Sequence, residues 1–193
     1  MLALLSAIEN GQIRGDITCV ISDCSSAQGV AIAKKRGLNI AVIDVDKSSF
    51  EAALINRIKQ EKPDLIALAG FMRILSPAFI KQFEGCIMNI HPSLLPAYKG
   101  LNTHQRVLKA KEKKHGCSVH FATSKLDGGP LIIQQEVEVK PDDTPDTLAA
   151  RVLEKEHIIY PKAVSLFCEG RLKQEGENCL LNGRVLKHPL KLN

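Results

Sequence analysis

The chain has 193 residues, 24% of them charged, and a formal net charge of +5 at pH 7. A chain of this length buries one good core, so we expect a single domain over residues 1–193 with one active crevice. The positive charge comes from scattered lysines and arginines, and only 4% of the residues are aromatic, which favours small anionic ligands over nucleic acid.

The cysteines and the apolar runs indicate the compartment. The six cysteines contain no C-x-x-C pair. This pattern indicates reduced thiols that pack as small hydrophobic residues, rather than disulfides, a metal site or a catalytic nucleophile. No apolar run is long enough to span a membrane, and the first residues lack the basic start of an export signal. We therefore expect a cytoplasmic protein with no membrane partner.

Helix-like and strand-like segments alternate through the first 70 residues. Apolar residues at helical spacing predict helices over residues 1–9, 29–36 and 48–60. Apolar runs predict strands over 16–23, 39–44 and 64–70, and the last run is continuous enough to be buried on both faces. The alternation predicts βαβ units and hence an α/β fold: an open, doubly wound, mostly parallel Rossmann-like sheet with helices on both faces.

The rest of the chain continues the pattern with longer loops. Ser76 and Pro77 predict the start of a helix that ends near residue 83, and Asn102 or Thr103 is expected to cap a helix that runs to about residue 112. Strands are expected over 86–90, 116–123 and 131–139, and the longest helix over 145–168. The alternation around Ser118 and His120 predicts that one face of the 116–123 strand is less buried. Short strands after residue 168 predict a small C-terminal hairpin.

Polar side chains gather where the 86–90 strand ends. Side chains alternate between the faces of a strand, so Asn89 and His91 project to the same side at its carboxyl end, before Pro92 ends the ladder. Ligands bind at the carboxyl ends of strands in open α/β sheets. An amide that can donate to a developing oxyanion and an imidazole that can move a proton suit acyl chemistry.

Asp127 is the third candidate. It precedes Gly128, Gly129 and Pro130 in a sharp loop at another strand end, where its carboxylate would favour an imidazolium at His91. An aspartate before two glycines is more often a simple turn residue, so the residues alone favour the functional interpretation only slightly. The other histidines are interpreted as structural side chains: His104, His115, His120, His157 and His188.

Five segments in order resemble the phosphoribosylglycinamide formyltransferases, within the wider formyltransferase superfamily. The segments are GFMRILSPAFI at 70–80, NIHPSLLPAYKG at 89–100, HGCSVHFAT at 115–123, LDGGP at 126–130 and EHIIYP at 156–161. The resemblance implies transfer of the formyl group of 10-formyltetrahydrofolate, the co-substrate, to the amine of glycinamide ribonucleotide in purine synthesis. It implies small-molecule partners, no metal, no nucleic acid, and a monomer or homodimer.

The resemblance also implies roles for individual residues. The catalytic positions are Asn89, His91 and Asp127, with Asn89 and His91 stabilising the oxyanion and Asp127 assisting proton transfer. The folate positions are Lys47, Met72, Arg73, Ile74, Leu75, Asn89, Thr123, Ser124, Lys125, Leu126 and Asp127. The ribonucleotide positions are Leu153, Glu154, Lys155 and Glu156, and Glu156 is expected to bind ribose hydroxyls.

The chain departs from the family at its start. The family begins with a strand and a glycine-serine-asparagine loop that binds phosphate at a helix N-terminus, whereas residues 1–15 correspond to the helix that follows. We expect the native protein to begin upstream of Met1, because loss of a central strand would leave buried backbone groups unpaired. A form that begins at Met1 is expected to bind the ribonucleotide poorly. Lys99 and Asn102 also differ from the proline and histidine that relatives carry more often, and neither change is expected to abolish activity.

Two other functions remain open. Another formyl-folate enzyme is possible, but methionyl-tRNA formyltransferase would need an additional C-terminal domain, and formyltetrahydrofolate hydrolase an N-terminal one. A catalytically silent folate- or nucleotide-binding relative would fit the missing phosphate loop. The presence of Asn89, His91 and Asp127, which we name the catalytic trio, argues against it.

Overall fold

The computed structural model describes residues 1–192, with every side chain among them except that of Lys47. The helices are α1 (Leu2–Glu9), α2 (Gln28–Lys35), α3 (Lys47–Glu61), α4 (Pro77–Gln82), α5 (Thr103–Lys109) and α6 (Pro145–Cys168). The strands are β1 (Val20–Ser22), β2 (Ile40–Val42), β3 (Ile66–Leu68), β4 (Ile87–His91), β5 (Lys114–Phe121), β6 (Leu131–Glu138), β7 (Leu172–Glu175), β8 (Asn178–Leu181) and β9 (Arg184–Val185). Each helix and strand predicted up to residue 168 is present, with the early strands shorter than expected.

The strands form three sheets within the described residues. β1 pairs with β2 in parallel, and a second sheet has the order β3-β4-β5-β6. β3 and β4 run parallel, whereas β5 and β6 join as antiparallel strands. The C-terminal strands β7, β8 and β9 form a small antiparallel sheet, one strand more than the predicted hairpin. The predicted α/β fold is confirmed, and the expectation of an upstream strand and phosphate loop stays a prediction.

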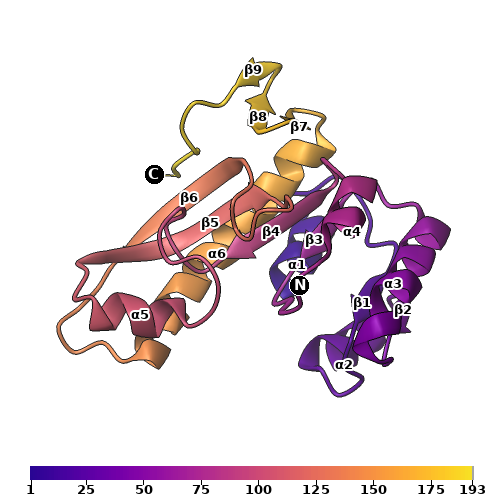
Figure 1. The fold of residues 1–193 in the computed structure, drawn as a ribbon, viewed down its shortest axis with the longest axis horizontal. Helices are drawn as coiled ribbons and strands as arrows, with labels where there is room; N and C mark the ends of the chain where they lie inside the picture. Colours follow the sequence, from indigo (N-terminus) through magenta and orange to yellow (C-terminus); the bar gives the residue numbers. More distant parts are fainter. Residues whose placement is uncertain (193) are drawn as a thin grey trace.

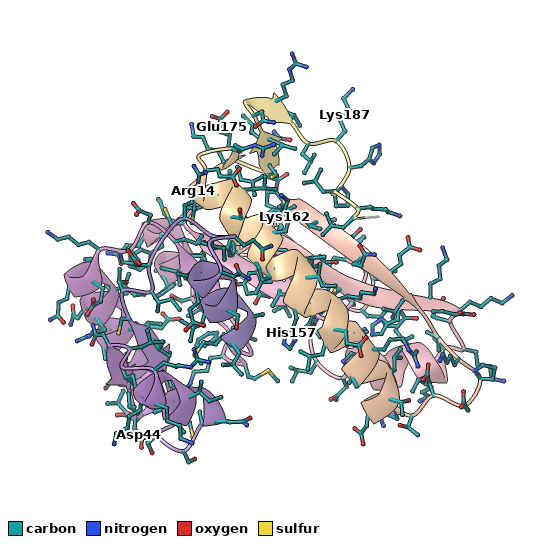
Figure 2. All side chains as sticks on the ribbon, turned by 180° about the vertical axis from the view of Figure 1, so that it is seen from behind. Arg14, Asp44, His157, Lys162, Glu175 and Lys187 are labelled. Atoms are coloured by element: carbon teal, nitrogen blue, oxygen red, sulfur yellow. The ribbon has the colours of Figure 1, made fainter. Side chains whose placement is uncertain are left out.

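Helices cover both faces of the second sheet, as predicted. Ile87 of β4 belongs to a cluster with Phe50 of α3 and Phe79 of α4, whereas its neighbour Met88 belongs to a cluster with Val152 and Ile159 of α6. Consecutive strand residues point to opposite faces, so α3 and α4 lie on one side and α6 on the other. Figure 1 shows α6 passing behind β4, β5 and β6, and in the reverse view of Figure 2 the same helix lies in front of them.

The helix starts follow from local chemistry. The Ser76 hydroxyl accepts from the Phe79 backbone N–H at 3.1 Å, and Pro77 occupies the first helical turn of α4. The start of α6 is a capping box: the Thr144 hydroxyl accepts from the Thr147 backbone N–H, and the Thr147 hydroxyl accepts from the Thr144 backbone N–H. Both arrangements satisfy backbone donors that a helix start leaves open.

Two expectations about burial are wrong. Ser118 and His120 are 0% and 2% exposed, although the alternation predicted a less buried face on β5. The loops at residues 92–102 and 122–130 cover that face, and a pattern within one strand does not reveal such coverage. In β3, Ala67 is exposed rather than buried on both faces. Among the described residues, no helix is both long enough and apolar enough to cross a membrane.

Candidate functional site

Asn89 and His91 lie at the carboxyl end of β4, where the sheet changes from parallel to antiparallel pairing. In the register of β4 with β5, Asn89 faces His120 and His91 faces Ser118. Directly opposed residues of an antiparallel pair point to the same face. The predicted convergence of Asn89 and His91 on one face is therefore what the strand geometry produces, and β5 adds His120 and Ser118 to that face.

The ring of His91 is held by a backbone carbonyl. Its Nε2 lies 2.9 Å from the Tyr98 carbonyl oxygen, and the residue is 6% exposed. A carbonyl only accepts, so Nε2 carries a hydrogen and donates it. The other nitrogen, Nδ1, lies 3.4 Å from Asp127 Oδ2. The carboxylate thus faces the ring nitrogen that the Tyr98 carbonyl leaves free.

The Asp127 carboxylate is fixed by the loop opposite. The Gly100 backbone N–H donates to Asp127 Oδ2 at 2.8 Å, and the Asp127 side chain is 9% exposed. Asp127 has a positive φ of 44°, a conformation in which aspartate is found more often than most residues. We name residues 92–102 the proline loop and residues 122–130 the aspartate loop. The Gly100–Asp127 hydrogen bond joins these two loops over the end of β4.

His120 is a site residue that the sequence interpretation missed. Its Nδ1 lies 2.8 Å from the Phe121 carbonyl oxygen, so Nδ1 carries the hydrogen of the neutral ring. Burial lowers the pKa of His120 and favours this neutral form. Its Nε2 can then accept from Asn89 Nδ2, 3.3 Å away, and it lies 3.8 Å from Asp127 Oδ1.

The contact with His120 orients the Asn89 amide. Because Nε2 of the neutral His120 ring is an acceptor, the NH₂ group rather than the carbonyl of Asn89 faces it. One amide hydrogen is used in this contact, and the second remains for another acceptor. The signal for His120 was the strand register, which pairs it with Asn89 and which spacing along one strand does not supply.

The expected folate segment after β3 is partly exposed and partly anchored. Met72 and Ile74 are 73% and 81% exposed, unusual for large apolar side chains. Arg73 is anchored: its Nε donates to Asp23 at 2.7 Å, and its guanidinium carbon lies 4.2 Å from the centre of the Phe50 ring. Leu75 packs against the cluster under α3 and α4. The side chains of Met72 and Ile74 are therefore exposed to solvent, while the contacts of Arg73 and Leu75 hold the segment in place.

The expected folate residues of the aspartate loop surround Asp127. Leu126 is 55% exposed, and Thr123 and Lys125 are joined through the Thr123 hydroxyl. Lys125 forms an ion pair with Glu177, between β7 and β8, and Ser124 is exposed. Lys47 is the first residue of α3, and its side chain lies outside the part that the structure describes.

The expected ribonucleotide residues lie on α6, apart from the trio. Leu153 is 47% exposed and Glu154 is exposed, while Lys155 and Glu156 are half-buried. Burial raises the pKa of Glu156. None of these four side chains hydrogen-bonds to Asn89, His91 or Asp127 in the described part of the chain. Figure 2 labels the next residue, His157, on this helix.

The chain is similar in sequence to known proteins over most of its length. The profile of a family described as formyl transferase matches residues 1–164. The phosphoribosylglycinamide formyltransferase of Escherichia coli (strain K12) is 42% identical over 188 residues, which cover 95% of this chain and 89% of that protein. The corresponding Haemophilus influenzae protein is 39% identical over 187 residues, covering 95% and 88%.

Solved structures extend the likeness to the fold. The phosphoribosylglycinamide formyltransferase of Coxiella burnetii is similar with a TM-score of 0.89 at 44% identity, covering 95% of this chain and 88% of that one. A formyltetrahydrofolate deformylase of Pseudomonas syringae is similar with a TM-score of 0.86 at 23% identity. The match covers 93% of this chain and 61% of the deformylase, and it shows a likeness of fold alone.

Proposed function

The chain belongs to the formyl transferase family, and from this premise we propose that it transfers the formyl group of 10-formyltetrahydrofolate to the amine of glycinamide ribonucleotide. One observation carries the proposal. An amide, an imidazole and a carboxylate converge at the end of β4, with His91 Nδ1 3.4 Å from Asp127 Oδ2 and Asn89 held against His120. The 42% identity to a named phosphoribosylglycinamide formyltransferase over 95% of the chain supports this choice of substrates.

The trio can perform acyl transfer with separate roles. When the amine attacks the formyl carbon, negative charge develops on the formyl oxygen. Asn89 has one N–H left after its contact with His120, and an imidazolium at His91 presents Nδ1–H on the same face. His91 is buried and Asn89 is half-buried, and a hydrogen bond holds each donor before reaction, the condition under which hydrogen bonds stabilise a developing oxyanion most.

Asp127 completes the proton balance. The new bond joins the amine nitrogen to the formyl carbon, and the bond from that carbon to the folate nitrogen breaks. The attacking nitrogen must lose a proton and the departing nitrogen must gain one. A carboxylate that is 9% exposed and fixed by the Gly100 N–H can accept and return this proton, directly or through one water.

The other expected site residues are assigned to one of the two substrates. We assign the exposed apolar side chains of Met72, Ile74 and Leu126 to the flat folate body. The other proposed folate positions are Lys47, Arg73, Leu75, Asn89, Thr123, Ser124, Lys125 and Asp127. We assign residues 153–156 to the ribonucleotide, with Glu156 as the acceptor for ribose hydroxyls. The protein is expected to work in the cytoplasm on these small molecules, as a monomer or homodimer.

A transfer assay with purified protein tests the proposal. Loss of the formyl-folate should require glycinamide ribonucleotide, and one formylated ribonucleotide should form for each folate consumed. Release of formate at the same rate without the ribonucleotide would indicate a deformylase instead. Binding of folate with no turnover under any condition would favour a catalytically silent relative.

A further inference from the structure

Three polar side chains form a row across the sheet that begins at His91 of the catalytic trio. His91 of β4 faces Ser118 of β5, and Ser118 faces Gln134 of β6. Opposed residues in antiparallel strands share a face, so all three point toward the proline loop. Ser118 is 0% exposed and Gln134 is half-buried, and neither belongs to the catalytic trio.

Ser118 and Gln134 hold the backbone of the proline loop. The Ser118 hydroxyl donates to the Ser93 carbonyl at 2.6 Å and accepts from the Leu95 N–H at 3.0 Å. Gln134 Nε2 donates to the Leu95 carbonyl at 2.7 Å and to the Ser118 hydroxyl at 2.8 Å. The hydroxyl thus uses its one hydrogen and both lone pairs. Leu95 has both its N–H and its carbonyl bound by this pair of side chains.

The loop segment that they hold leads directly to the groups that set His91. Three residues after Leu95, the Tyr98 carbonyl accepts from His91 Nε2. Two residues further, the Gly100 N–H donates to Asp127. A displaced Leu95 would therefore move the acceptor that orients the His91 ring and the donor that holds the carboxylate.

We propose that Gln134, acting through Ser118 and Leu95, is a positioning residue that holds His91 and Asp127 in the geometry that formyl transfer requires. The role rests on the proposed function and adds a residue that contacts neither substrate. One Gln134 amide hydrogen holds the Leu95 carbonyl, and the other holds the Ser118 hydroxyl that binds the Ser93 carbonyl and the Leu95 N–H. Gln134 therefore fixes the path of the loop that carries the Tyr98 carbonyl.

The chain offers a matched control in the next residue. Gln135 lies on the same strand and carries the same side chain, but it pairs with Cys117 across the sheet, and its Oε1 accepts from the Leu192 N–H at 3.3 Å. Replacement of either glutamine by leucine keeps the approximate side-chain volume and removes the amide. The two variants therefore differ in which face of β6 loses its polar group.

The test compares Gln134→Leu, Gln135→Leu and the wild type in the transfer assay. We expect Gln134→Leu to lower kcat by about ten- to hundredfold, the effect of a small misplacement of catalytic groups, and to displace the pH–rate profile. KM for the ribonucleotide should change by less than about threefold, because residues 153–156 lie apart from the loop. Gln135→Leu should match the wild type. Equal kcat and pH profile for Gln134→Leu and Gln135→Leu, both folded, would overturn the proposal.

A second measurement separates positioning from activity. Nitrogen-15 NMR of the His91 imidazole reports which ring nitrogen carries hydrogen, and the wild type should show it on Nε2. Gln134→Leu or, if that variant does not fold, Ser118→Ala should change this signal or broaden it. An unchanged His91 signal in a folded variant would overturn the proposal even if activity fell. If the wild type transfers no formyl group, the proposed function fails, while the NMR comparison still decides the positioning role.

Discussion

The two nitrogens of His91 have different partners, and this asymmetry defines the chemistry available to the site. Nε2 donates to the Tyr98 carbonyl, which leaves Nδ1 facing Asp127. Asn89 has its amide oriented by His120 in a similar way. His91 is thus fixed through its other ring nitrogen, and Asn89 through the other hydrogen of its amide nitrogen.

Removal of either donor should affect turnover far more than binding. We expect His91→Ala and Asn89→Ala each to lower kcat by about 10²- to 10³-fold, the usual loss for an oxyanion donor, while the dissociation constant for folate changes little. Steady-state kinetics and fluorescence titration with a folate analogue measure the two quantities. Parallel losses in affinity and turnover would instead place these side chains in ground-state binding.

Asp127→Asn tests charge with little change of shape. The asparagine oxygen can still accept from the Gly100 N–H, but the negative charge beside His91 Nδ1 is lost. We expect a fall in kcat of at least about tenfold together with an altered pH–rate profile. If the variant kept the wild-type turnover and profile, the proton-transfer role of Asp127 would be wrong.

We expect His115 to make folding stability depend on pH. It is 1% exposed, and its Nε2 lies 3.0 Å from Nδ1 of His104. Burial first, and then the charge of His104, lowers the pKa of His115 from 6.5 to about 4. Because the folded state resists protonation, stability is fully present above pH 6.5 and is lost as the pH falls toward 4.

The expected loss from His115 is about 3 kcal/mol between pH 7 and pH 4, from the size of the shift. Urea unfolding at a series of pH values measures it. His115→Phe should lower stability at pH 7 but should flatten the decline between pH 6.5 and pH 4. An identical decline in both proteins would show that His115 does not carry this dependence.

Sequence reasoning reached some of these residues and missed others for physical reasons. Alternation within one strand placed Asn89 and His91 together, because that period depends only on the local backbone. Asp127 came from its loop motif and from the family resemblance. His120 and Gln134 were missed because their roles depend on strand register, which is set by pairing between distant segments. The catalytic and substrate roles stay predictions until variants are measured.

At the scale of elements, the aspartate loop depends on a close backbone approach. A Cβ on Gly129 would lie 1.9 Å from the Phe121 carbonyl oxygen, at the end of β5. The Phe121 N–H in turn donates to the Pro130 carbonyl at 3.0 Å. The loop therefore leaves β5 and enters β6 with backbone against backbone, and Asp127 sits at its tip.

Gly129→Ala should distort this loop. Relief of the contact requires backbone movement, so we expect a destabilisation of about 1–3 kcal/mol and a loss of turnover larger than the loss of stability implies. Thermal unfolding and kcat should be measured together. Gly15→Ala is the control, since its Cβ would meet nothing closer than 3.5 Å. Wild-type turnover in Gly129→Ala would show that the loop tolerates the movement.

The predicted elements were accurate where local signals were strong. Ser76-Pro77 and Thr144-Pro145 marked helix starts that the structure shows as capped. Burial was less predictable, because the polar face of β5 is covered by two loops whose paths no periodicity reveals. The antiparallel direction of β5 and β6 was also not predicted, since either direction is compatible with an apolar strand.

At the scale of the whole molecule, Arg73 in the segment after β3 connects the N-terminal part of the chain to the site. The Arg73–Asp23 ion pair joins that segment to the end of β1, and Phe50 of α3 lies under the same guanidinium. α6 spans the back of the sheet and anchors it through Tyr160, whose hydroxyl lies 2.9 Å from the Leu68 carbonyl oxygen and 3.1 Å from that of Met88. Figure 1 shows the C-terminal strands at one end of this assembly.

The most direct test of formyl transfer at this site follows the formyl carbon itself. Purified protein would be given 10-formyltetrahydrofolate with a carbon-13 formyl group, with and without glycinamide ribonucleotide, alongside His91→Ala. The wild type should place the label in the amide of the ribonucleotide product, only when the ribonucleotide is present, and His91→Ala should bind folate without moving the label. Label recovered as free formate from the wild type, or equal transfer by His91→Ala, would contradict it.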